Sequence, residues 1–261
     1  MAGFMDILGT MVQQGMSQSS NARISNALGA GKSSASLNDI MGGLGEMLGG
    51  GQTSKPEQAG TGGLGGVLGE VLGNLGNNKA ALGGLGALAG AVLGGGTSSA
   101  KGAVGGGGLA ILASLAFSAL KKAGQTPQPP RALLEPETTA EKEALEQDAE
   151  LIVKAMINAA KADNRIDETE IQRIVGKLEE DGLTEEEKNF FVQEARKPMD
   201  FDLVVRSAAG NPEMAVQIYA ASLLAIEVDT PAEKRYMQEL ANGLGLNSQV
   251  TGNIEGFLGM V

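Results

Sequence analysis

The side chains that could do chemistry in this sequence are carboxylates in two short acidic segments. They are Asp163, Asp167 and Glu170 in the first segment and Glu227, Asp229 and Glu233 in the second. The chain contains no cysteine and no histidine, so any metal site must be built from carboxylate and carbonyl oxygens. Such oxygens are the ligands that hard divalent cations such as Mg²⁺ and Ca²⁺ prefer.

The same acids also fit a structural role at the starts of helices. Asp167 precedes Glu170 by three residues, and Thr230 precedes Glu233 by three, which is the spacing of a capping box. A carboxylate at a helix N-terminus is stabilising without any ligand. Asp163 lies before the cap and has no capping role, so it is the residue that discriminates between capping and cation binding.

Catalysis is not expected from this composition. Without cysteine and histidine there is no thiolate nucleophile, imidazole base, zinc site or disulfide. No helix supplies an isolated carboxylate pair with a partner for acid–base work. Residues 29–34 resemble the end of a phosphate-binding loop, but Asn26 stands where that motif begins with glycine.

Charge divides the chain into two unlike halves. Residues 1–124 carry 7 Lys or Arg against 5 Asp or Glu, residues 125–261 carry 13 against 26, and the net charge is −11. The acidic half repels phosphates, so no nucleic-acid partner is expected. Its field favours cations or basic partners, unless it is simply the solvated surface of a helical domain.

Residues 1–78 form a low-complexity segment rich in Gly and Ser. A similar phrase of glycines and leucines recurs at residues 42–49, 62–69 and 83–90. Each glycine costs a helix about 1 kcal/mol relative to alanine, so this part is expected to be disordered or only transiently helical in water. Self-association through the glycine-rich half is a further expectation.

Residues 79–122 are predicted to associate with a membrane. The lysines of this segment bound two uncharged stretches of 21 and 19 residues, each close to the length that spans a bilayer as a helix. Glycines recur every fourth residue in the first stretch, a spacing that lets membrane helices pack closely. Lys121 and Lys122 at the end favour a cytoplasmic C-terminal domain. A soluble apolar hairpin and a disordered segment are the alternatives.

A proline-rich linker at residues 123–136 is expected to precede an acidic all-α domain at residues 137–261. Apolar residues recur three and four apart after Thr138, on one face of a helix. Thr184 and Thr230 each precede a glutamate by three residues and mark helix starts. No segment alternates like a strand. The pattern of this region therefore predicts a bundle of about six or seven helices that folds by itself.

The C-terminal region contains a faint internal repeat. A shift of 63 residues superposes residues 162–170 on residues 225–233, as expected for a duplicated helix–acidic turn–helix unit. The run Ala162-Asp-Asn-Arg-Ile-Asp-x-x-Glu170 resembles the Ala-Asp-Gly-x-Ile-x-x-x-Glu signature of TerB-like domains, the tellurite-resistance superfamily. This resemblance covers about residues 140–260. The glycine-rich half before it is similar to the YebE-like family of bacterial inner-membrane proteins of unknown function.

The TerB-like resemblance implies an all-helical bundle whose acidic turns bind a divalent cation such as Ca²⁺ or Mg²⁺. Asp163, Asp167 and Glu170 match the first turn of the signature. Ile226 replaces the aspartate of the signature in the second turn, so the acids there imply a weaker companion site. Asn164 replaces the glycine of the signature, although asparagine also tolerates a left-handed turn.

These observations predict a non-catalytic protein of the bacterial inner membrane, with a membrane-associated glycine-rich half. Its cytoplasmic TerB-like domain is expected to bind an unknown protein partner or to sense ions, in a stress or tellurite-resistance setting. One alternative is a soluble, acidic protein that binds divalent metal. Another is a glycine-rich structural protein that assembles with itself. No cofactor is expected beyond a weakly bound divalent cation.

Overall fold

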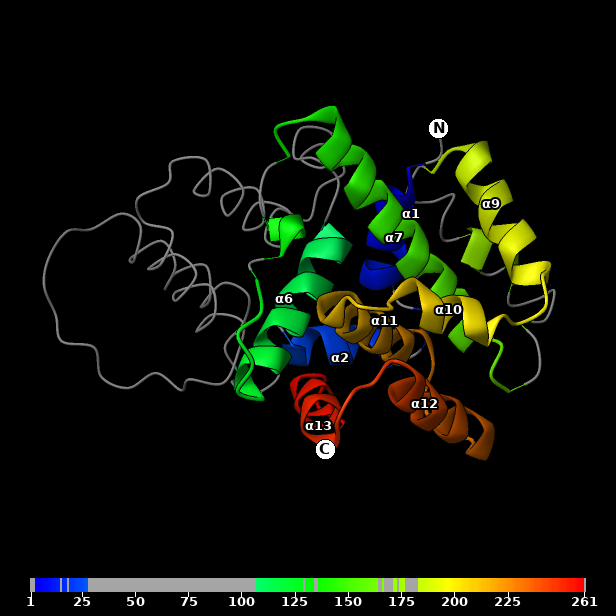
Figure 1. The fold of residues 1–261 in the computed structure, drawn as a ribbon. Coiled ribbons are helices and arrows are strands. Elements are labelled where there is room, and N and C mark those ends of the chain that lie inside the picture. The colour runs from blue at the N-terminus through cyan, green and yellow to red at the C-terminus, as the bar shows by residue number, and fades with distance from the viewer. Residues whose placement is uncertain are drawn as a thin grey trace, which may run out of the picture.

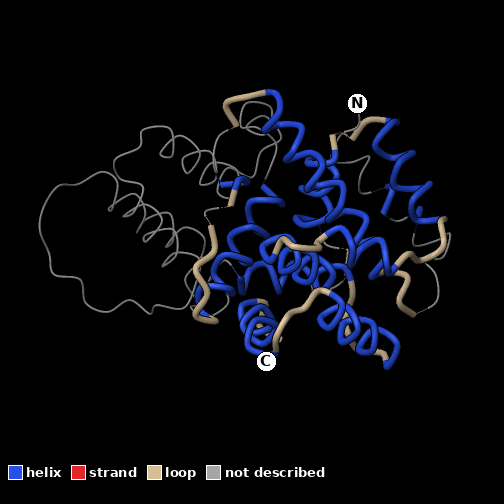
Figure 2. The backbone as a smooth tube through the Cα atoms, viewed as in Figure 1, coloured by secondary structure: helices blue, strands red, loops and turns tan. Residues whose placement is uncertain are grey.

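Helices make up the regular structure of the described residues. The computed structural model describes residues 3–27 and 107–260, except for positions 15, 18, 129, 134–135, 164–165, 167–170, 173 and 177–182. Within these ranges there is no strand, and Figure 2 shows helices joined by short loops. The prediction of an all-α fold is therefore confirmed.

The helices follow one another along the chain with short turns between most of them. They are α1 (Phe4–Gln14), α2 (Ser20–Ala27), α6 (Gly107–Lys122), the 3-10 helix η1 (Arg131–Leu133), α7 (Thr139–Ala159), α9 (Glu185–Arg196), α10 (Phe201–Ser207), α11 (Pro212–Ala225), α12 (Pro231–Gly243) and α13 (Ser248–Phe257).

Capping boxes set the starts of three of these helices. The hydroxyls of Thr138, Thr184 and Thr230 each accept a hydrogen bond from the amide of the glutamate three residues on, and the carboxylate of that glutamate accepts one from the threonine amide. Such a cap typically contributes about 1 kcal/mol. The helix starts that were predicted at the last two threonines are confirmed.

α11 is the central helix because it is apolar on every side. All of its residues from Met214 to Ala225 are buried, and a helix of this kind needs neighbours all around it. α7 and α6 lie along it, and α12 and α13 contact it as well. Figure 1 shows α11 crossing the middle of the molecule among these helices.

The N-terminal helix α1 belongs to the same core. Ile7, Leu8 and Val12 have no exposed surface, and α1 packs against both α7 and α6. In Figure 1, α1 and α2 lie among the other helices and not apart from them. Residues 3–27 and 107–122 therefore share one core with the helices that follow residue 137. The segments predicted from the sequence had placed these three parts in separate regions.

α6 is a core helix of the bundle. It has 16 residues, about 24 Å of helix, whereas the apolar core of a bilayer is about 30 Å thick. Its side chains from Leu109 to Ala116 are buried against α1, α11 and α13. Its apolar residues thus pack inside the protein.

The prediction of a transmembrane helix is wrong for the part of the chain that the structure describes. None of the helices there is both long enough and apolar enough to cross a membrane. The prediction of an inner-membrane protein rested on such a helix and loses that support. The other stretch with the expected length, residues 80–100, lies outside the described residues.

The proline-rich segment after α6 also packs on the bundle. Pro130 is buried, and η1 contacts α6. The guanidinium of Arg131 donates a hydrogen bond of 3.0 Å to Asp148 on α7. The described residues of this segment thus connect α6 to α7 along the surface of the bundle.

Candidate functional site

The first part of the chain ends against the acidic turn between α11 and α12. We call residues 3–27 the arm and the helices from α6 onward the body. In the turn, Val228 has a φ of 61°, a left-handed conformation that is rare for a β-branched residue. Holding a residue in this region costs about 1–3 kcal/mol, which the surrounding contacts must offset. Glu227, the residue before it, is contacted by the arm.

Arg23 of the arm closes the C-terminal end of α11. The last carbonyl groups of a helix have no partner inside the helix. The buried guanidinium of Arg23 donates to the carbonyls of Leu223, Ile226 (2.5 Å) and Glu227 (2.8 Å). One side chain therefore satisfies three carbonyls that lie about 200 residues further along the chain.

Arg23 is one of four polar side chains that lie three residues apart on the arm. They are Ser17, Ser20, Arg23 and Asn26. The Ser20 hydroxyl donates to the carbonyl of Leu224 over 2.5 Å, and the Asn26 amide donates to the carbonyl of Leu258 over 3.4 Å. The row thus reaches the ends of both α11 and α13. Sequence reasoning missed it, because residues 1–78 were treated as low in complexity, although the spacing of three was visible.

Glu227, one of the predicted ligands, is held by the arm. Its carboxylate accepts a hydrogen bond of 2.8 Å from the backbone amide of Ser19, and lies 3.9 Å from the Arg23 guanidinium. Burial by itself would raise the pKa of Glu227, but the bonds from Ser19 and the charge of Arg23 lower that pKa below its ordinary value. Burial lowers the pKa of Arg23, and the nearby carboxylates partly offset this.

The other two acids of this segment have different surroundings. Glu233 is buried, and its carboxylate accepts hydrogen bonds from the backbone and hydroxyl of Thr230 as part of the capping box. Asp229 is exposed. The structure does not bring these carboxylates together with Glu227. Among the described residues, no group of three or more Asp, Glu, His or Cys side chains could hold a metal ion.

The first acidic segment is only partly described. Asp163 is exposed in the turn that follows α7, while Asp167 and Glu170 lie outside the described residues. A cation site at these three acids therefore stays a prediction.

The other end of the arm brings its own Asp6 near two carboxylates of the body, Glu146 on α7 and Glu187 on α9. The amide of Gly3 donates to Glu187 over 2.8 Å, and the amide of Met5 donates to Glu146 over 3.2 Å. Burial raises the pKa of Asp6, and the charge of Glu187 adds to this. Burial also raises the pKa of Glu146, the bonds from the amides of Met5 and Phe4 lower it in part, and the charges of Asp6 and Glu187 add smaller increases. Glu146 and Glu187 thus anchor the start of α1, and both repel the Asp6 carboxylate.

Lys161 donates to the carbonyls at the C-terminal end of α9, in the way that Arg23 does for α11. It is buried, and its ammonium group donates to the carbonyls of Glu194 (2.8 Å) and Lys197 (2.9 Å) at the end of α9. Burial lowers the pKa of Lys161. Arg23 and Lys161 thus each complete the end of a helix.

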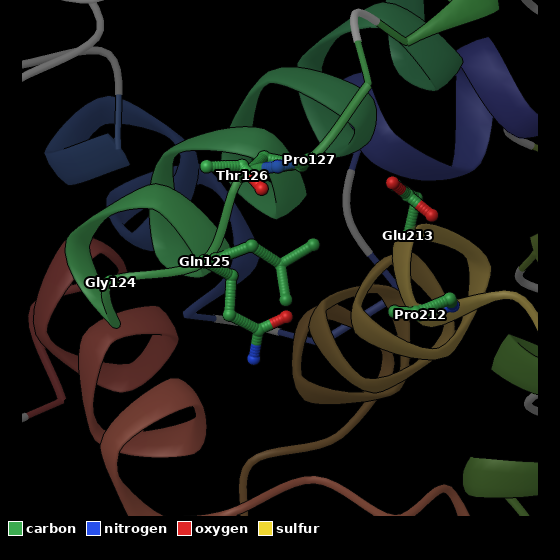
Figure 3. Close-up of a pocket in the computed structure, with 7 residues that line it drawn as sticks. Gly124, Gln125, Thr126, Pro127, Pro212 and Glu213 are labelled. Carbon is green, nitrogen blue, oxygen red and sulfur yellow. The ribbon is translucent and has the colours of Figure 1, made fainter.

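A shallow hollow of about 360 Å³ lies between the end of α6 and the start of α11. Figure 3 shows Gly124 to Pro127 on one side of it and Pro212 and Glu213 on the other. The Glu213 carboxylate accepts a hydrogen bond of 3.3 Å from the amide of Gln128. The hollow holds one acid and no basic side chain, so its lining provides no acid–base pair.

Comparisons with known proteins give the chain a family but no activity. A family model described as "Protein of unknown function (DUF533)" matches residues 75–258. An uncharacterized protein encoded in the ampR 5' region of Yersinia enterocolitica is 28% identical over 121 residues, which are 46% of this chain and 86% of that protein. No solved structure matches.

Proposed function

Starting from the fact that this chain belongs to the DUF533 family of proteins of unknown function, we propose that it is a non-catalytic interaction protein. In this proposal the helical body binds a protein partner, and the chain also associates with further copies of itself. The acidic half, with 26 Asp or Glu against 13 Lys or Arg, favours a partner with a basic surface.

The use of the buried charges supports this proposal. The buried charged side chains of the described residues are Arg23, Lys161, Glu187, Lys188, Glu194 and Glu233. The first two donate to carbonyls at helix ends, and Glu187 and Glu233 belong to capping boxes. Lys188 forms an ion pair with Glu185, and Glu194 forms one with Lys197. Groups committed in this way hold helices together, whereas a catalytic acid or base must be able to reach a substrate.

Sedimentation of the full chain tests the self-association. We expect the average mass to rise with protein concentration between about 1 and about 200 µM, because association follows mass action. An average mass equal to that of one chain over the whole range would contradict the proposal. Repeating the series at high salt shows how much charge repulsion between the acidic bodies weakens the association, because salt screens this repulsion.

The TerB-like resemblance extends the proposal to a role in stress or tellurite resistance. We expect bacteria that produce the full chain to tolerate more tellurite than bacteria that produce an Arg23→Glu variant, in which the arm is repelled by Glu227. Equal growth of the two strains, at equal protein levels, would argue against this setting.

Weak binding of a divalent cation is a second candidate function. The observation that favours it is the position of Asp163, which is exposed in the turn after α7 and starts no helix. A cation that binds the native state raises the melting temperature more as its concentration rises. We expect millimolar Ca²⁺, Mg²⁺ or Mn²⁺ to raise the melting temperature of the wild type but not of Asp163→Ala. Asp202→Ala, which removes an exposed acid on α10, is the matched control. No shift in the wild type would eliminate the site.

A further inference from the structure

The contacts between arm and body form a complete recognition surface. On the apolar side, Ile7, Leu8 and Val12 of α1 have no exposed surface. On the polar side, Ser20 and Arg23 donate to the carbonyls that end α11. The surface therefore selects an amphipathic helix followed by a row of donors, and the arm has both features.

We propose that the arm of one copy of this chain docks on the body of a second copy, so that the chain associates by exchanging arms. This inference rests on the proposed self-association and names its partner and surface. The contacts made between two copies are those that the structure shows within one chain. Reciprocal exchange between two copies produces a closed two-fold pair.

The length of chain between arm and body permits this exchange. Residues 28–106 separate the last residue of α2 from the first residue of α6. At about 3.3 Å per residue, these 79 residues can reach up to roughly 260 Å. The body, at about 150 residues, has a radius of gyration of only about 15 Å. The cost of closing a loop also grows with its length, so a long connection weakens the preference for docking within one chain.

Charge favours arm exchange over direct contact between bodies. The acidic half carries 26 Asp or Glu against 13 Lys or Arg, so two bodies repel each other. The arm contains one acid, Asp6, and one base, Arg23, and is neutral overall. A neutral arm on a long connection can therefore reach a second body while the two acidic bodies stay apart.

Cysteine pairing tests the exchange with the full chain. The sequence has no cysteine, so introduced thiols have no competing partners. A Cβ atom built on Gly259 of the body lies 3.3 Å from the Cβ of Asn26 on the arm, close to the 3.5–4.5 Å found in disulfides. One full chain carries Asn26→Cys, and a second, isotope-labelled chain carries Gly259→Cys. A disulfide between the two introduced cysteines requires the arm of the first chain to lie on the body of the second.

We expect the mixed chains to form this disulfide-linked heterodimer under oxidising conditions, up to about half of the chains for random closed pairs. Adding Arg23→Ala to the Asn26→Cys chain should lower the yield several-fold. The double variant in one chain is the control, because it forms a disulfide whenever the arm docks on any body. Since Gly259 has a φ of 71°, circular dichroism must show that the Gly259→Cys chains fold.

Absence of the heterodimer, while the double variant forms its disulfide within one chain, would overturn the exchange. Sedimentation then separates the two proposals: association without the heterodimer overturns arm exchange alone, and no association overturns self-association as well. If the Gly259→Cys chains do not fold, a synthetic peptide of residues 3–27 replaces them. An excess of this peptide should dissociate associated wild-type chains, and an unchanged mass would contradict the exchange.

Discussion

At the scale of single residues, two buried cations and one half-buried side-chain amide complete the ends of helices. Arg23 donates to carbonyls at the end of α11, Lys161 to those at the end of α9, and Asn26 to one at the end of α13. Carbonyls at a helix end that are buried without a donor cost about 1–3 kcal/mol each, so these side chains are needed wherever the end is covered by another helix. Among the described residues, most long-range hydrogen bonds thus join a side chain to a backbone group, as at these helix ends.

Replacing Arg23 should loosen the arm. Arg23→Ala removes three donors from buried carbonyls and is expected to lower the free energy of unfolding by about 2–3 kcal/mol. Hydrogen exchange of residues 19–27 should speed up as well. Ser25→Ala, at an exposed position on the same helix, is the control and should change neither quantity. An equal effect of the two substitutions would contradict the role of Arg23.

Replacing Glu146 should stabilise the protein at neutral pH. A carboxyl whose pKa is raised on folding adds stability below its unfolded pKa and loses it as the pH rises through the folded value. The pKa of Glu146 is raised, so its charge is unfavourable at pH 7. Glu146→Gln keeps an acceptor for the amide of Met5 and should raise the melting temperature by roughly 1–3 °C at pH 7.

The pH dependence of this effect distinguishes it from a general gain in stability. At about pH 3 the glutamate is mostly protonated in both states, so the wild type and Glu146→Gln should melt at similar temperatures. Thermal melts from pH 3 to pH 8 measure the difference. A gain that is the same at every pH would show that charge is not its cause.

At the scale of elements, α1 and α6 approach each other closely at Gly108. A Cβ atom placed on Gly108 would lie 2.9 Å from the carbonyl oxygen of Leu8 and 3.0 Å from the Cα of Gly9. Only glycine at position 108 lets the backbone of α1 pass so near. By contrast, a Cβ atom on Gly9 would meet nothing within 4 Å. The two glycines thus lie at the same contact, but only position 9 has room for a side chain.

Substituting these two glycines should therefore have opposite effects. Gly108→Ala is expected to push α1 away from α6 and to lower the free energy of unfolding by about 1–3 kcal/mol. Gly9→Ala should raise it by up to about 1 kcal/mol, because alanine favours the helix. Urea unfolding of the two full-length variants measures both changes. A loss of stability in Gly9→Ala as large as that in Gly108→Ala would contradict this contact.

At the scale of the whole molecule, the body depends on helices that lie before the proline-rich segment. α11 is buried on all sides, and two of the helices that cover α11 and α7 are α6 and α1. Removing α6 and α1 would expose apolar faces on both remaining helices. The fold is therefore one unit assembled from both ends of the sequence, with residues 28–106 between its parts.

Truncation should show this dependence directly. Residues 137–261 alone are expected to melt without a cooperative transition, although the sequence predicts that they fold by themselves. Residues 107–261 should regain part of the transition, and the full chain all of it, as α6 and then α1 are restored. Circular dichroism melts of the three chains test the order. A sharp melt of residues 137–261 at the temperature of the full chain would contradict it.

The sequence alone was sufficient for features that depend on neighbouring residues. The capping boxes at Thr184 and Thr230 follow from a spacing of three residues to a glutamate. These local preferences, together with the apolar periodicity, also predict the all-α class. They require no knowledge of which helix packs against which.

Only the tertiary structure decided where the apolar helices lie and what the acids do. The apolar run of α6 fits a bilayer and a protein core equally well by composition, and the packing of α1, α11 and α13 around it selects the core. Likewise Glu227 could bind a cation by its charge alone, yet Ser19 and Arg23 hold its carboxylate. Both outcomes depend on contacts between residues about 100 to 200 positions apart, and a spacing along the chain carries no information about such contacts.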